Sequence, residues 1–309
     1  MPRVTVVGSY IVALVMDTER LPTEGETVNG KNFHTTFGGK GSNVAVCAAR
    51  LGAESHFVGK LGRDAFGADF VSMLGREGVK TDGVLYSTSL PTGVGFILFK
   101  PDGTNLIAID RGANDDLCVS DVLDKQEIIR QSQVIVSPLE IPLATALAAA
   151  SLAKANGVKA ILNPAPALDL SGHDLKSIFA LTPNETEARV CLGLSPRDEI
   201  DEVDLAMALL ALGPEHVMLT RGRRGVLWAC AQGIKFIPAL NVKVVDTVGA
   251  GDAFNAGLAV GLSEGREVLE AIGLGVVTAS LSTEKRETIP SYPYRNEVDS
   301  RINGLLTSV

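Results

Sequence analysis

The chain has 309 residues, 46% of them hydrophobic, with a formal net charge of −8 and a pI near 5.1. An acidic chain cannot present a large basic face without an even more acidic remainder, so nucleic acid and anionic membranes are excluded as expected partners and a small solute is favoured. No apolar run approaches the roughly 18 residues of a membrane span, and the start of the sequence lacks a signal-peptide layout, so we expect a soluble, cytoplasmic protein. The cysteines are widely spaced without CxxC pairs, which predicts buried free thiols at Cys47, Cys118, Cys191 and Cys230.

The first third of the chain alternates apolar runs with amphipathic segments. Residues 3–8 are valine-rich and end in glycine, which is typical of a strand buried on both faces. A helix is expected over residues 44–51, a strand over 56–59 and a second helix over 65–78. This repetition indicates βα units.

Two segments interrupt the alternation. Residues 10–36 contain short extended pieces broken by proline and glycine, and residues 92–111 read as two strands around a turn at Pro101-Asp102-Gly103. We assign both segments to one small β lid.

The alternation resumes after the lid and continues to the last helices. The expected elements are a helix capped by Ser120, a strand at 133–137, a helix from 142 to 157, a strand at 158–162, a helix at 184–192 capped by Asn184, a helix at 202–212, strands at 216–220, 226–230 and 234–237, and helices at 252–263 and 266–281. Repeated βα units predict an α/β fold: a single domain over 1–309, with a mostly parallel central sheet, helices on both faces and ligands at the carboxyl ends of the strands.

The segment from Val244 to Gly257, VVDTVGAGDAFNAG, carries the strongest chemical signal. Small residues at Gly249, Ala250 and Gly251 leave backbone N–H groups uncovered where a helix begins, so their dipoles converge on an anion. Asp252 follows on the first turn, where a carboxylate suits a base that takes a proton from a hydroxyl attacking phosphorus. The alternative is a tight strand-to-helix turn with a first-turn acid favoured by the helix dipole.

A second glycine-rich turn, FGGKGSN at residues 37–43, precedes the first helix. It is not a Walker A loop, because Lys40 is followed by glycine rather than Ser or Thr. It gathers backbone donors at another helix start, or it is simply a turn.

Three further loops carry polar side chains after strands. Asn184 and Glu187 either hold water around Mg²⁺ on a nucleotide's phosphates or form a capping box. Residues 220–225, TRGRRG, either line those phosphates or form an exposed basic turn, and Glu140 lies at a site-facing strand end or at a solvated one. The histidines have no catalytic spacing, and no GxSxG, HExxH or GxGxxG motif is present, which argues against hydrolases, metalloproteases and dinucleotide-dependent dehydrogenases.

Several motifs together resemble one known family. They are Gly8-Ser9, PTEGETV at 22–28, FGGKGSN at 37–43, Gly112-Ala113-Asn114, LNPAPA at 162–167, TPNETEA at 182–188 and DTVGAGDAFNAG at 246–257. In this order, over nearly the whole chain, they resemble the ribokinase-like (PfkB) family of carbohydrate kinases, and within it the ribokinases.

The resemblance implies a three-layer fold with a β lid that is used for homodimerisation, and ATP-dependent phosphorylation of a sugar hydroxymethyl group with Mg²⁺. The sugar is expected to be ribose or a related pentose. The implied roles are a base at Asp252 within an anion hole of Gly249, Ala250 and Gly251; sugar contacts at Gly39, Lys40, Asn43 and Glu140; nucleotide contacts at Asn184, Thr220, Gly222 and Gly225; Mg²⁺ held through water by Glu187; and a monovalent cation, K⁺, at Asp246 and Val248.

Two departures from the family pattern leave alternatives open. Ile11 and Ala13 stand where ribokinases place an Asn and an Asp on the sugar hydroxyls, so deoxyribose or a ketohexose is an alternative substrate, and a non-catalytic sugar or nucleotide sensor is an alternative function. Arg286 and Glu287 stand where the family has a small glycine-containing turn, so the alternative to a K⁺ site is that the guanidinium of Arg286 takes the place of K⁺.

Overall fold

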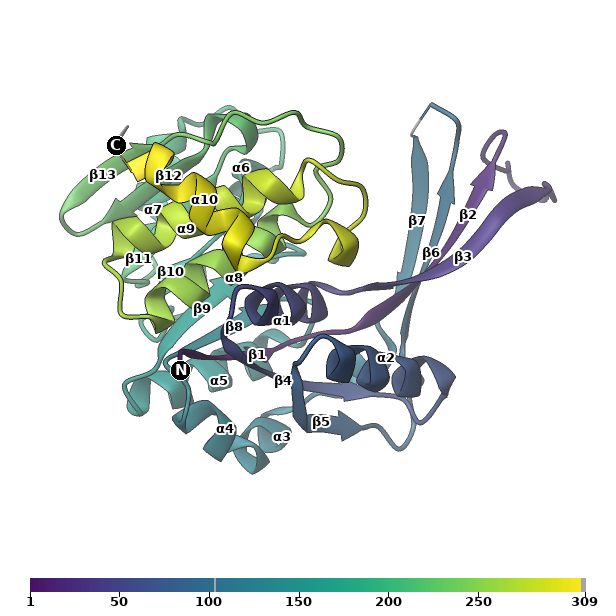
Figure 1. The fold of residues 1–309 in the computed structure, drawn as a ribbon, viewed down its shortest axis with the longest axis horizontal. Coiled ribbons are helices and arrows are strands. Elements are labelled where there is room, and N and C mark those ends of the chain that lie inside the picture. The colour runs from purple at the N-terminus through teal and green to yellow at the C-terminus, as the bar shows by residue number, and fades with distance from the viewer. Residues whose placement is uncertain (103, 307–309) are drawn as a thin grey trace.

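The computed structural model describes residues 1–102 and 104–306 and contains a nine-stranded main sheet (Figure 1). Its strands, in spatial order, are β13 (Gly233–Ile237), β12 (Val226–Cys230), β11 (His216–Thr220), β10 (Ala180–Leu181), β9 (Lys159–Asn163), β8 (Val134–Pro138), β1 (Arg3–Val7), β4 (Glu54–Leu61) and β5 (Lys80–Tyr86). All neighbours from β5 to β11 are parallel, whereas β12 and β13 are antiparallel additions. The predicted α/β class with a mostly parallel sheet is confirmed.

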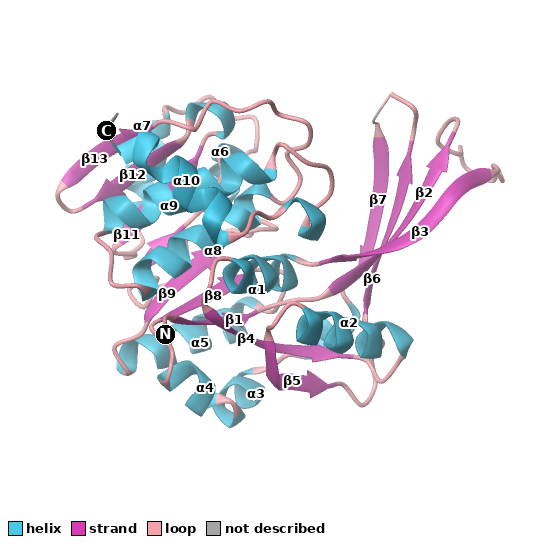
Figure 2. Ribbon diagram, viewed as in Figure 1, coloured by secondary structure: helices cyan, strands magenta, loops and turns pink. Residues whose placement is uncertain are grey.

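Helices cover both faces of this sheet (Figure 2). One face carries α1 (Lys40–Arg50), α2 (Ala65–Arg76), α8 (Ala250–Ser263), α9 (Val268–Ser282) and α10 (Arg295–Leu306); the other carries α3 (Val119–Asp124), α4 (Gln126–Arg130), α5 (Leu143–Ala155), α6 (Glu185–Cys191) and α7 (Glu202–Ala211). Short 3₁₀ turns, η1 (Gly112–Asp116), η2 (Gly222–Arg224) and η3 (Ile289–Ser291), join some of these elements. Each face has its own apolar core.

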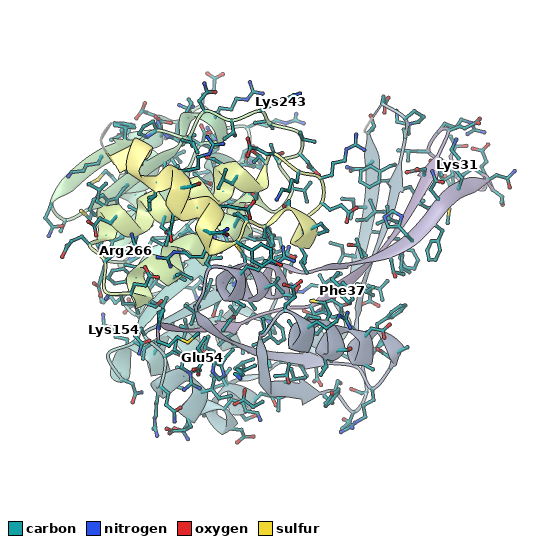
Figure 3. The ribbon with its side chains drawn as sticks, in the orientation of Figure 1. Lys31, Phe37, Glu54, Lys154, Lys243 and Arg266 are labelled. Atoms are coloured by element: carbon teal, nitrogen blue, oxygen red, sulfur yellow. The ribbon has the colours of Figure 1, made fainter. Side chains whose placement is uncertain are left out.

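A four-stranded second sheet projects from the body (Figure 1). Its order is β3 (Gly30–Gly38), β2 (Ile11–Thr18), β6 (Gly93–Phe99) and β7 (Asn105–Asp110). These strands come from the two segments expected to form a lid, except that β3 continues two residues past 36. Phe37 lies where this lid meets the body and Lys31 lies near its far end (Figure 3). Part of the expected turn at 101–103 lies outside the described residues, because Gly103 is not described.

Some local predictions need correction. The helix expected to be capped by Ser120 begins at Val119 and has Cys118 at its N-cap, where the Asp121 carboxylate accepts a hydrogen bond from the Cys118 amide. Cys118 is exposed, contrary to the prediction, whereas the other three cysteines are buried as predicted. Among the described residues no helix is both long and apolar enough to cross a membrane.

Candidate active site

A cavity of about 200 Å³ opens at the carboxyl ends of β9, β10 and β11, opposite the start of α8. Its lining is mostly polar and consists of Lys40, Asn163, Ala165, Thr182, Asn184, Glu187, Thr220, Thr247, Gly249, Gly251, Asp252 and Asn255. The fold thus brings together seven of the predicted site residues from four separate stretches of the chain. Parallel strands end at the same edge of a sheet, which is why these distant stretches meet.

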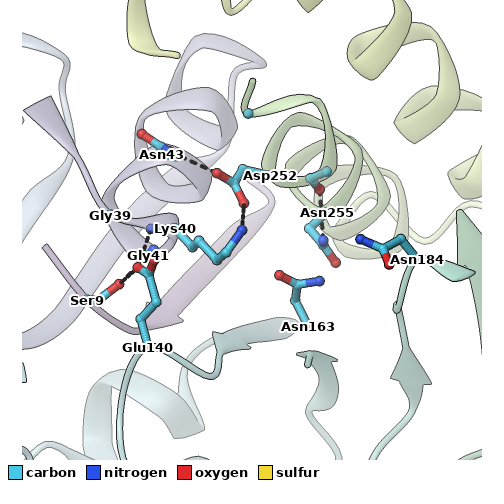
Figure 4. A network of polar contacts seen from close by, with 12 residues as sticks. Ser9, Gly39, Lys40, Gly41, Asn43, Glu140, Asn163, Asn184, Asp252 and Asn255 are labelled. Carbon is cyan, nitrogen blue, oxygen red and sulfur yellow. Dashed lines mark hydrogen bonds and ion pairs between the residues drawn. The ribbon is translucent and has the colours of Figure 1, made fainter. Parts of the chain in front are cut away.

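The Asp252 carboxylate lies between the first turns of two helices (Figure 4). One of its oxygens accepts a hydrogen bond from Asn43 Nδ2 at 2.8 Å, and the other is 3.8 Å from Lys40 Nζ. The residue is only 4% exposed, and the part that remains open faces the cavity. The geometry leaves this carboxylate fixed and able to accept a proton from a bound molecule.

Burial raises the pKa of the Asp252 carboxyl, although the Lys40 ammonium and the Asn43 amide oppose the shift. The Asp252 carboxylate in turn raises the pKa of Lys40 against the opposing effect of burial. A general base is most effective when its pKa moves toward the operating pH, so burial suits Asp252 to this role.

The amino end of α8 offers unsatisfied backbone donors next to Asp252. Gly249, at the N-cap, has φ of 78°, and a Cβ there would lie 2.6 Å from the Tyr292 hydroxyl, so only glycine fits. No side chain caps the helix, and a Cβ on Gly251 would meet no atom within 4 Å. The Ala250 amide donates to the Thr247 carbonyl at 3.3 Å, whereas the amides of Gly249, Gly251 and Asp252 have no backbone acceptor among the described residues. Uncommitted donors of this kind at a helix start are the arrangement of an anion hole.

Glu140 lies beneath the start of α1 rather than in the lining of the cavity. Its carboxylate accepts hydrogen bonds from the Lys40 amide at 2.7 Å and from the Ser9 hydroxyl (Figure 4). Burial raises the pKa of this carboxyl, and the Lys40 cation opposes that shift. Gly39, the N-cap of α1, has φ of 87°, and a Cβ there would lie 2.7 Å from the Ile11 amide. Glu140 and Gly39 thus set the position of Lys40.

The capping-box interpretation of Asn184 and Glu187 is confirmed. They form a reciprocal capping box at the start of α6, and both side chains also line the cavity. Burial raises the pKa of the Glu187 carboxyl, and one of its oxygens already accepts the Asn184 amide. In the part of the chain that the structure describes, no group of three or more His, Cys, Asp or Glu side chains could hold a metal. Glu187 fits Mg²⁺ held through water, since that ion commonly keeps several waters and uses phosphate oxygens.

The stretch 220–225 contributes less than expected. Thr220 lines the cavity, but Gly222 and Gly225 do not. A Cβ on Gly225 would lie 2.0 Å from the Ile237 carbonyl oxygen, so this glycine is explained by packing. Arg221 and Arg224 form ion pairs with Glu202, and Arg224 also pairs with Glu185. Their guanidinium groups are engaged by carboxylates rather than free for phosphates.

Asp246 fastens two loops beside the start of α8. Its Oδ1 accepts the Val248 amide at 3.0 Å, and its Oδ2 accepts the Glu287 amide at 3.1 Å. Arg286 is exposed and forms no ion pair with a described residue, which gives no support to the expectation that its guanidinium replaces K⁺. Glu287 adopts φ of 66°, which shows that the longer side chain occupies a turn suited to glycine.

Four polar lining residues were not among the predicted site residues: Asn163, Thr182, Thr247 and Asn255. Asn163 is the last residue of β9 and Thr182 follows β10 directly, so their position at the ends of strands was a usable signal. Asn255 lies one helical turn beyond Asp252, and the spacing of three residues places both on one face of α8.

Comparison with known proteins settles the family. The sequence matches the pfkB family carbohydrate kinase over residues 1–295. The chain belongs to this family. It is 37% identical over 293 residues to the ribokinase of Haemophilus influenzae, covering 95% of this chain and 96% of that one.

Two further relatives of this carbohydrate kinase are informative. The structure of Arabidopsis thaliana ribokinase complexed with ribose and ATP superposes with a TM-score of 0.87 at 33% identity, covering 97% of this chain and 98% of that chain. The deoxyribokinase of Salmonella typhi is 35% identical over 294 residues, covering 94% of this chain and 95% of that one. The chain is therefore about equally identical to two relatives that are named for different sugars.

Proposed function

We propose that this carbohydrate kinase transfers a phosphoryl group from ATP to the hydroxymethyl group of ribose or a related pentose. The observation that carries the proposal is the buried Asp252 carboxylate beside the uncapped amino end of α8. The ribokinase relatives support the nature of the two substrates.

In the proposed reaction, the sugar hydroxyl oxygen attacks the terminal phosphorus of ATP while Asp252 accepts the hydroxyl proton. The new bond joins the sugar oxygen to phosphorus, and the broken bond releases ADP. The amides of Gly249, Ala250 and Gly251 would stabilise the charge on the moving phosphoryl group, since preorganised donors act where charge develops. Lys40, 3.8 Å from the base, adds a positive charge next to the same place.

We place the nucleotide along Asn184 and Thr220, with Gly222 and Gly225 in the adjoining turn. Mg²⁺, held through water by Glu187, would neutralise the phosphates when bound. K⁺ is proposed near Asp246 and the backbone of Val248, where a cation would reinforce the field at the start of α8. Gly39, Lys40, Asn43 and Glu140 define the sugar side of the site, and the Asn43 Oδ1 is buried without a hydrogen-bond partner among the described residues, so a sugar hydroxyl could donate to it.

We also propose that the protein is a cytoplasmic homodimer joined through the lid. The support is the unusual exposure of apolar side chains on the lid sheet, namely Phe33, Phe96, Leu106, Ile107 and Ile109, which are 50–60% exposed. Ile107 and Ile109 lie on one face of the lid sheet, and Phe96 and Leu106 lie on the other. Exposed apolar surface of this kind is typical of an interaction site.

A second candidate substrate, 2-deoxyribose, is favoured by the lid strand nearest the site. Ile11 and Ala13 are 6% and 8% exposed and share one face of β2. On the neighbouring strand β3, Thr36 is paired with Ala13, and its hydroxyl donates to a Glu287 carboxylate oxygen at 3.4 Å. The Glu287 amide donates to Asp246, so this face of the lid is turned toward the loop that contains Asp246. An apolar wall there offers no partner to a sugar hydroxyl and does not reject a sugar that lacks it.

The test compares phosphorylation of ribose and of 2-deoxyribose by ATP in the wild type and in Ala13→Asp. We expect both sugars to be phosphorylated, with kcat/KM values within about tenfold, a difference under about 1.4 kcal/mol. Ala13→Asp should improve ribose selectively, because a carboxylate rejects a sugar that lacks its partner hydroxyl. Ala13→Leu is the control, because leucine is close in size to aspartate but is apolar.

Three outcomes would count against parts of the proposal. A wild type that prefers ribose several hundredfold would show that another group recognises the hydroxyl. Activity on a ketohexose alone would replace the pentose. Tight sugar binding without any phosphorylation would identify a sensor on the kinase fold.

A further inference from the structure

A chain of buried polar side chains runs beneath the cavity from β9 to α8. Asn163, Thr182 and Asn255 are 6%, 2% and 1% exposed, yet all three line the cavity that holds Asp252. Buried polar groups that form a connected network fix a geometry, because each lost contact leaves a partner unsatisfied.

The hydrogen bonds of this chain have a definite direction. Asn163 Nδ2 donates to the Thr182 carbonyl at 3.0 Å, and the Thr182 hydroxyl donates to Asn255 Oδ1 at 2.7 Å. Asn255 Nδ2 then donates to the Gly251 carbonyl at 2.8 Å (Figure 4). Because Asn255 Nδ2 has a carbonyl partner, the amide orientation is fixed and its oxygen is free to accept from Thr182.

The hydrogen bond from Asn255 to the Gly251 carbonyl affects the anion hole, because this carbonyl shares a peptide unit with one of the donors. The Gly251 carbonyl and the Asp252 N–H belong to the same planar peptide, so holding the oxygen also fixes the direction of the N–H. That N–H is one of the donors at the open end of α8, and Gly249 and Gly251 on either side of Ala250 give this turn little stiffness of its own.

We propose that Thr182 and Asn255 are positioning residues that lock the Gly251–Asp252 peptide and thereby preorganise the anion hole. The inference rests on the proposed phosphoryl transfer. An anion hole stabilises a transition state only to the extent that its donors are already aligned. Loss of the Thr182 hydroxyl or of the Asn255 amide should therefore reduce kcat and leave substrate binding almost unchanged.

The kinetic test uses Thr182→Val, which removes only the hydroxyl, and Thr182→Ser, which keeps it. We expect Thr182→Val to lower kcat at least tenfold with the KM for ATP and ribose within about twofold, and Thr182→Ser to stay within about twofold of the wild type. Thr278→Val is the matched control, because it removes a buried hydroxyl with the same 2.7 Å hydrogen bond in α9, away from the cavity. It should lower stability without the loss in kcat.

Asn255→Leu provides an independent variant in case Thr182→Val folds poorly. It should give a similar loss, and the double variant should lose little more than either single variant, because the two side chains act as one unit. Equal kcat in Thr182→Val and the wild type, or losses that multiply in the double variant, would overturn the inference.

Hydrogen exchange over residues 249–255 gives a readout that does not need activity. The exchange rate should rise in Thr182→Val and not in Thr182→Ser or Thr278→Val. A wild type without phosphotransfer would refute the proposed reaction, whereas unchanged exchange in Thr182→Val would refute the positioning role by itself.

Discussion

Asp252 must be buried and must also carry a negative charge, and these two requirements oppose each other. The residue is 4% exposed, and burying a carboxylate is unfavourable unless it is paired or hydrogen-bonded. Lys40 and Asn43 reduce that cost, and both come from α1. The remaining cost appears as the raised pKa of the Asp252 carboxyl, because the folded protein holds the proton more tightly than the unfolded chain does.

The raised pKa predicts the pH dependence of the reaction. The base must be ionised to accept a proton, so kcat/KM should fall on acidification, and the fall should begin above the ordinary aspartate pKa of about 3.9. The measurement is the kcat/KM for ribose across the acidic range, with far-UV circular dichroism at each pH to monitor folding. A rate that stays constant down to about pH 4 while the protein remains folded would be inconsistent with a buried base.

Residue-level predictions from the sequence succeeded where a residue follows a strand or begins a helix. Asp252, Lys40, Glu187 and Thr220 were placed at the carboxyl edge by this logic, and all of them line the cavity. The logic fails where side-chain partners come from elsewhere in the chain: Arg221 is engaged by Glu202, and no local pattern reveals that pair.

At the scale of elements, the site depends on two helix starts held close together. Helices α8 and α9 pack at short range, since a Cβ on Gly257 would lie 2.7 Å from the Gly275 Cα atom. Such close packing of small residues leaves α8 little freedom to shift. The loop before α8 is joined to the loop after α9 by the Asp246 carboxylate and by the amides of Val245 and Asp246, which donate to the Thr283 carbonyl.

The Asp246 connection predicts different effects for two neighbouring substitutions. Asp246→Ala removes both side-chain hydrogen bonds that position the loops beside the anion hole, so kcat should fall by about tenfold or more. Arg286→Ala removes an exposed side chain without an ion pair among the described residues, so kcat in K⁺ should stay within about twofold of the wild type. Initial rates in K⁺ and in choline buffer provide the measurement.

The comparison of cations also tests the K⁺ proposal. We expect saturable activation of the wild type and of Arg286→Ala by K⁺, and a weaker response in Asp246→Ala. Loss of K⁺ activation in Arg286→Ala would restore a role for the guanidinium that its exposed position argues against.

In the whole molecule, the lid sheet exposes apolar side chains that no other part of the described chain covers. Ile107 and Ile109 lie opposite Ile97 and Gly95, so alternation along the strands places them on the same face as Val15 and Ala13. Both isoleucines are just over half exposed. A second copy of the lid would remove this apolar face from water.

The lid therefore predicts a dimer that charge can break. The wild type should have twice the 32.4 kDa chain mass in light scattering after gel filtration, and the double substitution Ile107→Lys with Ile109→Lys should give the monomer mass. Thr104→Lys, at the described end of the lid hairpin, adds a charge off this face and should leave the dimer intact. A monomeric wild type at micromolar concentration, or a double variant that remains dimeric, would refute the lid interface.

The overall architecture was predictable from sequence because it depends on the spacing of apolar residues and on the order of the elements along the chain. Short apolar runs that alternate with helical segments predicted the parallel strands, and the broken extended segments predicted the lid. Contacts between distant segments were not predictable in this way. The chain of Asn163, Thr182 and Asn255 joins β9, β10 and α8, and no local pattern specifies which polar side chains will meet across such separations.

The most direct test of the account is the kinetic effect of Asp252→Asn. The amide keeps the size of the side chain but cannot accept the hydroxyl proton, so kcat for ribose should fall by roughly 10²–10⁴-fold. Calorimetric binding of ATP should stay within about threefold, and Asp124→Asn, an exposed position on α3, should behave as the wild type. Unchanged turnover in a folded Asp252→Asn protein would contradict the assignment of Asp252 as the base.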